Sequence, residues 1–167
     1  MDTSIPAAIV AAILMVSAVL LARTSLRSFD DMGQVWKEME VRASEQANTE
    51  LTVTGVSHVS GPDWEVDLRN DGSTWLSEYD QMDLVVQYTP ASGTQVVDWI
   101  PYTSGSLADN TWVVSSITSD SFEPGLLNPG ETLVMRFRLN PAAANGTTNR
   151  FFFSSELGVT VSSIFTG

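Results

Sequence analysis

Few residues in this sequence have side chains that could do chemistry, and they do not cluster. His58 is the only histidine and there is no cysteine, so multi-histidine metal sites, thiolate metal sites and disulfides are excluded. No Ser-His-Asp set, glycine-rich phosphate loop or carboxylate pair with a reason for displaced pKa values is evident. We therefore predict that the protein is not an enzyme and has no cofactor, and we expect His58 on the surface of a strand.

The densest group of acids lies in NDGSTWLSEYDQMD, residues 70–83. Such a run could bind calcium, but its Asp, Gly and Glu spacing does not match an EF-hand loop. Asp63, Glu65 and Asp67 alternate with apolar residues, which is typical of the solvent-exposed face of a strand. We therefore predict no metal site at either place.

One modification site is indicated. Residues 145–147 read Asn-Gly-Thr, an N-glycosylation sequon flanked by small and polar residues. Such tripeptides also occur by chance, but a turn at this place would leave room for a sugar. Asn145 is therefore a candidate for an N-linked glycan in a host that has the pathway.

The balance of charge limits the partners. The chain has a formal net charge of -12, and residues 51–167 carry 13 acids against four arginines. A surface with this excess of acids repels nucleic acid and anionic lipid head groups. We therefore predict no nucleic-acid partner and an outer part that is soluble and self-repelling.

The elements that position these residues differ between the two ends of the chain. From about residue 49 onward, short segments rich in β-branched residues alternate with turns; in DWEVDLR, for example, Trp64, Val66 and Leu68 share one face. Seven or eight such segments without an intervening helix predict an immunoglobulin-like antiparallel β-sandwich. We expect its core to be filled by the phenylalanines and by Trp64, Trp75, Trp99 and Trp112.

The N-terminal segment predicts a long helix. Residues 5–22 are apolar or small apart from the hydroxyl of Ser17, and as a helix they would span about 27 Å, close to the thickness of a bilayer core. They lack the basic start and small-x-small site of a secretory signal. The next residues contain no proline and keep a helical apolar stripe, so we expect one helix from about Ser4 to Ala47, roughly 65 Å long.

The predicted fold class is therefore α+β, with a long hydrophobic N-terminal helix followed by the sandwich. We expect the helical part at residues 1–48, with an apolar half at 4–22 and an amphipathic half at 23–48, and the outer β-domain at 49–167. Alanines at heptad spacing form one face of the apolar half, and small residues allow helices to approach closely. Alanine is also common in membrane helices, so this face alone leaves a lipid anchor and a helix bundle both open.

A long helix that is apolar in its first half and runs directly into a β-domain resembles the type IV pilin superfamily. The segments LRNDGSTWL and LNPGETLVMRFRL, with the apolar run, make the chain most similar to archaellins and archaeal-type pilins. Bacterial pilins carry glutamate at the fifth mature position, where this chain has Ile5, and archaellins generally lack that acid too. The resemblance implies that a peptidase removes a short basic leader immediately before Met1.

The resemblance also implies a function. It indicates a structural subunit that is inserted in the membrane before assembly and then polymerises with identical subunits into an extracellular filament. The filament would serve motility if it is an archaellum, or adhesion if it is a pilus. The helix would form the filament core and the β-domain its outside. The residues that we expect to pack in that core are Ala7, Ala11, Leu14, Ala18, Ala22, Leu26, Phe29 and Trp36.

Two other functions remain open at this point. The chain could be a membrane-anchored minor or stator-type component of the same machinery, which does not polymerise. It could also be an unrelated anchored β-sandwich adhesin, for instance one that recognises carbohydrate through exposed tryptophans.

Overall fold

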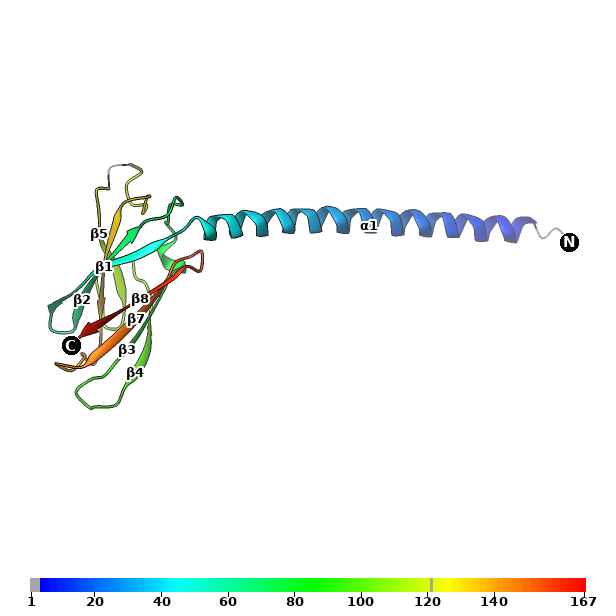
Figure 1. Ribbon diagram of the computed structural model, residues 1–167. Coiled ribbons are helices and arrows are strands. Elements are labelled where there is room, and N and C mark those ends of the chain that lie inside the picture. The colour runs from blue at the N-terminus through cyan, green and yellow to red at the C-terminus, as the bar shows by residue number, and fades with distance from the viewer. Residues whose placement is uncertain (1–3, 121) are drawn as a thin grey trace. The chain divides into compact units, whose positions relative to one another are not determined.

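The computed structural model describes residues 4–120 and 122–167, and it describes the side chains of the N-terminal helix from Ile9 onward. The chain forms two compact units that divide between Ala43 and Ser44. Helix α1 runs without interruption from Ser4 to Ala47 (Figure 1). The first three residues, next to which we place the leader processing, lie outside the described part, as does the side chain of Ala7.

The second unit contains eight strands. Their bounds are β1 Leu51–Ser60, β2 Asp63–Asn70, β3 Asp83–Tyr88, β4 Val96–Ile100, β5 Trp112–Thr118, β6 Thr132–Arg138, β7 Thr148–Ser154 and β8 Thr160–Thr166. A short 3-10 helix, η1, covers Tyr79–Gln81 between β2 and β3. Every strand pairing is antiparallel.

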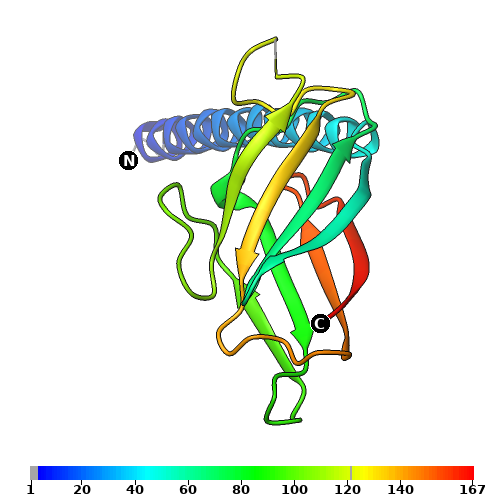
Figure 2. The same ribbon diagram turned by 90° about the vertical axis from the view of Figure 1, so that its left-hand side faces the viewer.

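The strands form two four-stranded sheets that pack face to face (Figure 2), in the orders β1-β2-β6-β5 and β4-β3-β7-β8. If the strands are lettered in chain order, these are the two sheets of an immunoglobulin domain with one additional edge strand, β4. The predicted fold class, a long apolar helix followed by an antiparallel β-sandwich, is confirmed.

Alternation along the strands builds the core. Trp64, Val66 and Leu68 of β2 are buried, and on the paired β6 so are the alternate residues Leu133, Met135 and Phe137. The largest fully buried side chains, all exposed by less than 2%, are Trp112, Tyr88, Phe137, Phe151, Phe153, Leu68, Leu76, Leu84, Ile100, Leu127, Leu133 and Met135. Burial at this scale is the dominant stabilising contribution in a domain of this size.

The expectation that Trp64, Trp75, Trp99 and Trp112 all fill the core is wrong for two of these four. Trp64 and Trp112 are buried, but Trp75 and Trp99 keep 54% and 60% of their surface exposed. Phe122 is also exposed, because it lies in the loop between β5 and β6. Residue type alone therefore overestimated the aromatic core.

The loop that follows β2 hydrogen-bonds to the segment between α1 and β1. The amides of Asp71 and Gly72 donate to the carbonyl of Glu50, and the amide of Ser73 donates to the carbonyl of Asn48, at 2.8 to 3.1 Å. The side chain of Asn70 is fully buried behind this loop and donates to the carbonyls of Thr74 and Leu127. These bonds fix the start of β1 to the sandwich.

Candidate functional site

The residues predicted to pack in a filament core lie on α1, and their described side chains are all exposed in the isolated chain. Phe29 and Trp36, the largest of them, keep 70% and 66% of their surface. The same holds for the remaining described members of the set, which are Ala11, Leu14, Ala18, Ala22 and Leu26. A helix that is apolar on all sides is stable only where lipid or other protein surrounds it.

The two halves of α1 differ as the sequence predicts. By length and composition, the helix from Ile9 to Ala47 contains a stretch that could cross a membrane, and none of that stretch is buried within the protein. The first charged side chain after it is Arg23. In the amphipathic half, one shallow apolar hollow is lined by Met32, Val35, Trp36 and Met39. An apolar stripe therefore continues beyond the length that a bilayer needs.

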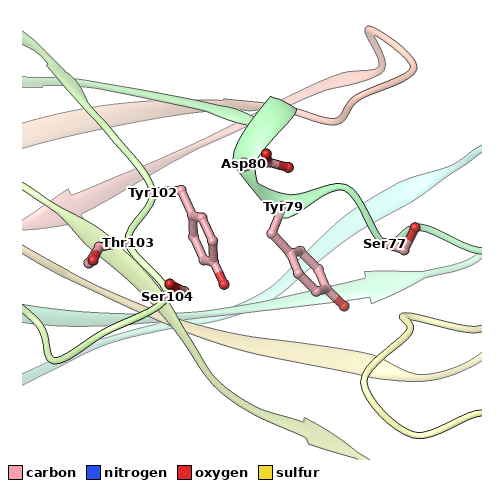
Figure 3. Close-up of a pocket in the computed structure, with 6 residues that line it drawn as sticks. All are labelled: Ser77, Tyr79, Asp80, Tyr102, Thr103 and Ser104. Atoms are coloured by element: carbon pink, nitrogen blue, oxygen red, sulfur yellow. The ribbon is translucent and has the colours of Figure 1, made fainter.

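An open pocket of about 520 Å³ lies beside η1 in the sandwich (Figure 3). It is lined by Ser77, Tyr79, Asp80, Tyr102, Thr103 and Ser104. The rings of Tyr79 and Tyr102 lie 6.2 Å apart, and the Tyr79 hydroxyl donates to the carbonyl of Gly125. Burial, with help from nearby carboxylates, raises the pKa of Tyr79 to about 12. The phenol therefore stays protonated at neutral pH and is a poor general base.

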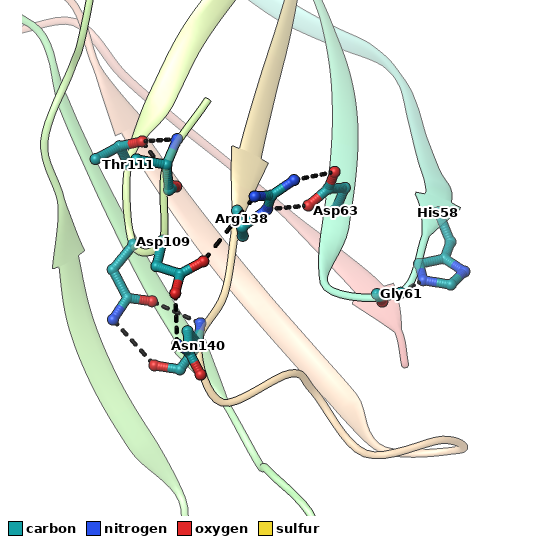
Figure 4. A network of polar contacts seen from close by, with 9 residues as sticks. His58, Gly61, Asp63, Asp109, Thr111, Arg138 and Asn140 are labelled. Carbon is teal, nitrogen blue, oxygen red and sulfur yellow. Dashed lines mark hydrogen bonds and ion pairs between the residues drawn. The ribbon is translucent and has the colours of Figure 1, made fainter. Parts of the chain in front are cut away.

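The acids on β2 are structural partners of arginines on β6 (Figure 4). Arg138 forms a two-bond ion pair with Asp63, at 2.6 and 2.9 Å, and its far side lies 4.0 Å from Asp109. Hydrogen bonding to Arg138 holds the pKa of Asp63 below its usual range. Arg136 pairs with Glu65 through a single hydrogen bond from its Nε, at 2.7 Å. Asp63 therefore stays ionised at neutral pH, and the two ion pairs tie β2 to β6.

His58 is an exposed residue of β1, as expected. Its ring nitrogen hydrogen-bonds to the carbonyl of Gly61 across the β1–β2 turn, at 2.8 Å, and its ring lies against Trp64. Within the residues that the structure describes, no group of three or more acids, histidines or cysteines is arranged to hold a metal ion. Of the acids in residues 70–83, Asp71 pairs with Arg69 at 3.0 Å, and Asp83 accepts a hydrogen bond from Nε1 of Trp99 at 2.9 Å.

Asn145 lies in an exposed turn before β7. Gly146 of the sequon adopts a positive φ of 75°, and the hydroxyl of Thr147 donates to the carbonyl of Ala144 at 2.6 Å. The carbonyl of Gly167 accepts from the amide of Gly146, so the C-terminus is attached to the same turn.

No family model and no curated protein matches the chain. Solved structures do. The archaeal flagellum of Methanospirillum hungatei strain JF1 matches 99% of this chain and 93% of its own, with a TM-score of 0.60 and 15% identity. The archaeal flagellin FlaB1 of Methanocaldococcus jannaschii matches 71% of this chain and 89% of its own, with a TM-score of 0.53 and 16% identity.

A stator protein matches as well. FlaG, the archaellum periplasmic stator protein of Sulfolobus acidocaldarius, matches 70% of this chain and 99% of its own, with a TM-score of 0.50 and 25% identity. Identities at this level establish a common fold, and fold alone does not assign a role. The expected resemblance to archaellins is confirmed as a resemblance of fold: the chain has the archaellin-like fold found in both filament and stator proteins of the archaellum.

Proposed function

We propose that this protein is a component of an archaellum-like machine on the cell surface and, within it, a filament subunit. The observation that carries the proposal is the uncovered apolar surface of α1, which continues from the membrane-length stretch into the amphipathic half. The match to the archaeal flagellum supports it, because that match spans 99% of this chain and so includes the helix.

The physical reason is the cost of leaving this surface in water. Burying one large aliphatic or aromatic side chain contributes roughly 1.5 to 3 kcal/mol, and α1 exposes more than ten such side chains. Lipid can cover the first half. Phe29 and Trp36 lie beyond it, where the neighbouring residues are charged, and packing against other copies of α1 would cover them. Ala11, Ala18 and Ala22 would let those copies approach closely.

In this proposal the subunit is held in the membrane by α1 before assembly and is extracellular afterwards, with the β-sandwich on the outside of the filament. Identical subunits are its main partners. Asn145 would carry a glycan on the outer surface.

A second role has a specific observation in its favour. The sandwich is 25% identical to the stator protein FlaG over 99% of that chain, which is more than its identity to either filament protein. In a stator-type component, α1 would be a membrane anchor and the sandwich a binding domain facing the cell envelope. The two roles differ in what α1 contacts, so α1 is the place to test them.

The test is the ratio of sheared filament to membrane-fraction protein for variants of α1. Ala11→Leu adds three carbons to the small-residue face, which would force neighbouring helices apart at a cost of about 1 to 3 kcal/mol per subunit. Val16→Leu is the matched control, because it lies about 140° away around the helix and adds one carbon. We expect Ala11→Leu to lower the ratio at least severalfold, while Val16→Leu leaves it near the wild-type value.

A lipid anchor would behave differently. Leucine is more apolar than alanine, so Ala11→Leu would leave insertion unchanged in a protein whose helix contacts only lipid. Equal ratios for the two variants would therefore contradict the filament role and favour the stator-type role. Leu14→Asp is the harsher variant, because an unpaired carboxylate in an apolar helix bundle has no water to solvate it.

A further inference from the structure

Part of the outward face of the sheet β4-β3-β7-β8 is apolar. The strand register places two rows of side chains on this face: Trp99, Val85, Phe152 and Ser162 in one, and Val97, Gln87, Arg150 and Ile164 in the next. We call these eight residues the outer-sheet patch. Its members Val97, Trp99 and Ile164 are exposed by 64%, 60% and 59%. Contiguous apolar surface of this kind on a water-soluble domain marks a protein interface.

The opposite sheet shows that this is not a general property of the domain. On the outward side of β2 and β6, Asp63 and Glu65 pair with Arg138 and Arg136. That face carries ion pairs, which water solvates well. The polar atom of Trp99, in contrast, is already satisfied, because its Nε1 donates to Asp83 at 2.9 Å. The ring is therefore held in place with its apolar surface outward.

Arg150 is the cation of the outer-sheet patch. Its guanidinium lies over the ring of Phe152, 5.9 Å from the centroid. The other three arginines of the sandwich form ion pairs with acids of their own sheet or loop. Within the described part of the chain Arg150 forms no such pair, although the sequence has 20 acids. A surface that combines exposed apolar groups with one unpaired cation is complementary to apolar groups beside a carboxylate.

We propose that the outer-sheet patch binds the β5–β6 loop of a second copy of this chain. That loop presents Phe122, which is 68% exposed, directly beside the exposed carboxylate of Glu123. Phe122 of one copy packs beside Trp99 and Phe152 of the next, and Glu123 pairs with Arg150. Aromatic side chains contribute large apolar contact areas at such interfaces.

This contact joins two different surfaces of the same chain, so it is head-to-tail. Contacts of that type repeat from copy to copy and produce rings or filaments instead of closed two-fold dimers. The inference deepens the proposed function and rests on it, because packing of the α1 helices would bring neighbouring copies close together. It adds a contact between outer domains to the bundle of α1 helices.

The test uses the absence of native cysteine. Full-length protein with Pro124→Cys and Ser162→Cys carries one thiol in the loop and one in the patch, since Ser162 pairs with Phe152 in the register of β7 and β8. We expect mild oxidation, in membranes and in sheared filaments, to give a ladder of dimers, trimers and larger species. The control is Pro124→Cys with Ser57→Cys, because Ser57 is exposed and opposite Glu65 on the ionic face. It should give no ladder.

Charge exchange completes the test. In the first cysteine background, Arg150→Glu should lower the ladder yield at least fivefold, and adding Glu123→Arg should restore it. No ladder, dimers only, equal ladders from both cysteine pairs or a double variant that is not restored would each overturn the inference. Failure of the proposed function is seen separately, because wild-type protein would then yield no sheared filaments whether or not crosslinks form in the membrane fraction.

Discussion

Gly72 is a position at which one added methyl group should destabilise the sandwich. It lies in the loop that follows β2, which hydrogen-bonds to the residues just before β1. A Cβ atom built there would lie 2.5 Å from the carbonyl oxygen of Asn48, 2.5 Å from the amide nitrogen of Glu50 and 2.9 Å from the Cα of Thr49. All three are backbone atoms, which cannot turn aside as a flexible side chain can.

The cost of Gly72→Ala follows from what must move. If the loop withdraws, it loses three hydrogen bonds: from Asp71 and Gly72 to Glu50, and from Ser73 to Asn48. Each contributes about 0.5 to 1.5 kcal/mol. If the loop stays, overpacking costs about 1 to 3 kcal/mol. We therefore expect Gly72→Ala to lower the free energy of unfolding of the sandwich by roughly 2 to 4 kcal/mol.

Urea denaturation of full-length protein, followed by fluorescence of the buried tryptophans, measures this difference. With a urea dependence of about 2 kcal/mol per molar, the midpoint should fall by roughly 1 to 2 M. Gly105→Ala is the control, because its nearest atom, Oγ1 of Thr103, is 3.7 Å away. If the two variants unfold within about 0.5 kcal/mol of each other, the close approach at Gly72 does not determine the stability of the loop.

Four further predictions are independent of this one. Because Arg138 lowers the pKa of Asp63 below 3.8, the stability that this ion pair contributes is present above that pH and lost as the pH falls through the folded-state value; Asp63→Asn should therefore be less stable than wild type in urea at pH 7, with a smaller difference at pH 3. Burial raises the pKa of Tyr79 from 10.0 to about 12, so stability should be lost as the pH rises from 10 through 12, and Tyr79→Phe should flatten that loss in an alkaline titration. Trp64→Ala should cost about 3 to 5 kcal/mol of unfolding free energy, whereas alanine at the exposed Trp75 should change it by less than about 0.5 kcal/mol. Mass spectrometry of native material should find a glycan on the peptide 142–150, and an unmodified Asn145 there would contradict the assignment.

Strand patterns were readable from the sequence wherever one face of the strand is uniformly apolar. In β2, apolar and acidic residues alternate without exception from Asp63 to Leu68, and the acids pair with arginines that alternate in the same way on β6. The period of two residues corresponds directly to the two faces of a sheet. The long helix was readable for a similar reason, because no proline or glycine interrupts residues 7–32.

Trp99 shows where this reasoning fails. In the segment Val96–Ile100, both alternating sets contain apolar residues, and Asp98 is the only polar one. The tertiary register decides between them: Val96, Asp98 and Ile100 share the face of the buried Tyr88, Val86 and Leu84, and Val97 and Trp99 are left outside. A sequence pattern that satisfies both faces equally well cannot predict which face is buried.

The loop contacts could not be predicted from the sequence, for a different reason. Asn70 donates to the carbonyl of Leu127, 57 residues later in the chain, and buried Glu131 accepts from the amide of Asn128. Asparagine and glutamate in turns are usually solvated, so their types predict exposure. They are buried here because their hydrogen bonds satisfy backbone groups that the fold has removed from water.

The distribution of charge determines where copies of this chain can meet. The acidic excess of the sandwich makes neighbouring copies repel, and at physiological salt that repulsion is screened beyond about 8 Å. It therefore acts mainly on surfaces in close contact, where it opposes association between acidic faces. Residues 5–22 of α1 carry no charge, and the outer-sheet patch carries only a cation. Apolar burial can exceed charge repulsion at these two surfaces, so the acids elsewhere on the sandwich would direct the proposed assembly to the helix and to the patch.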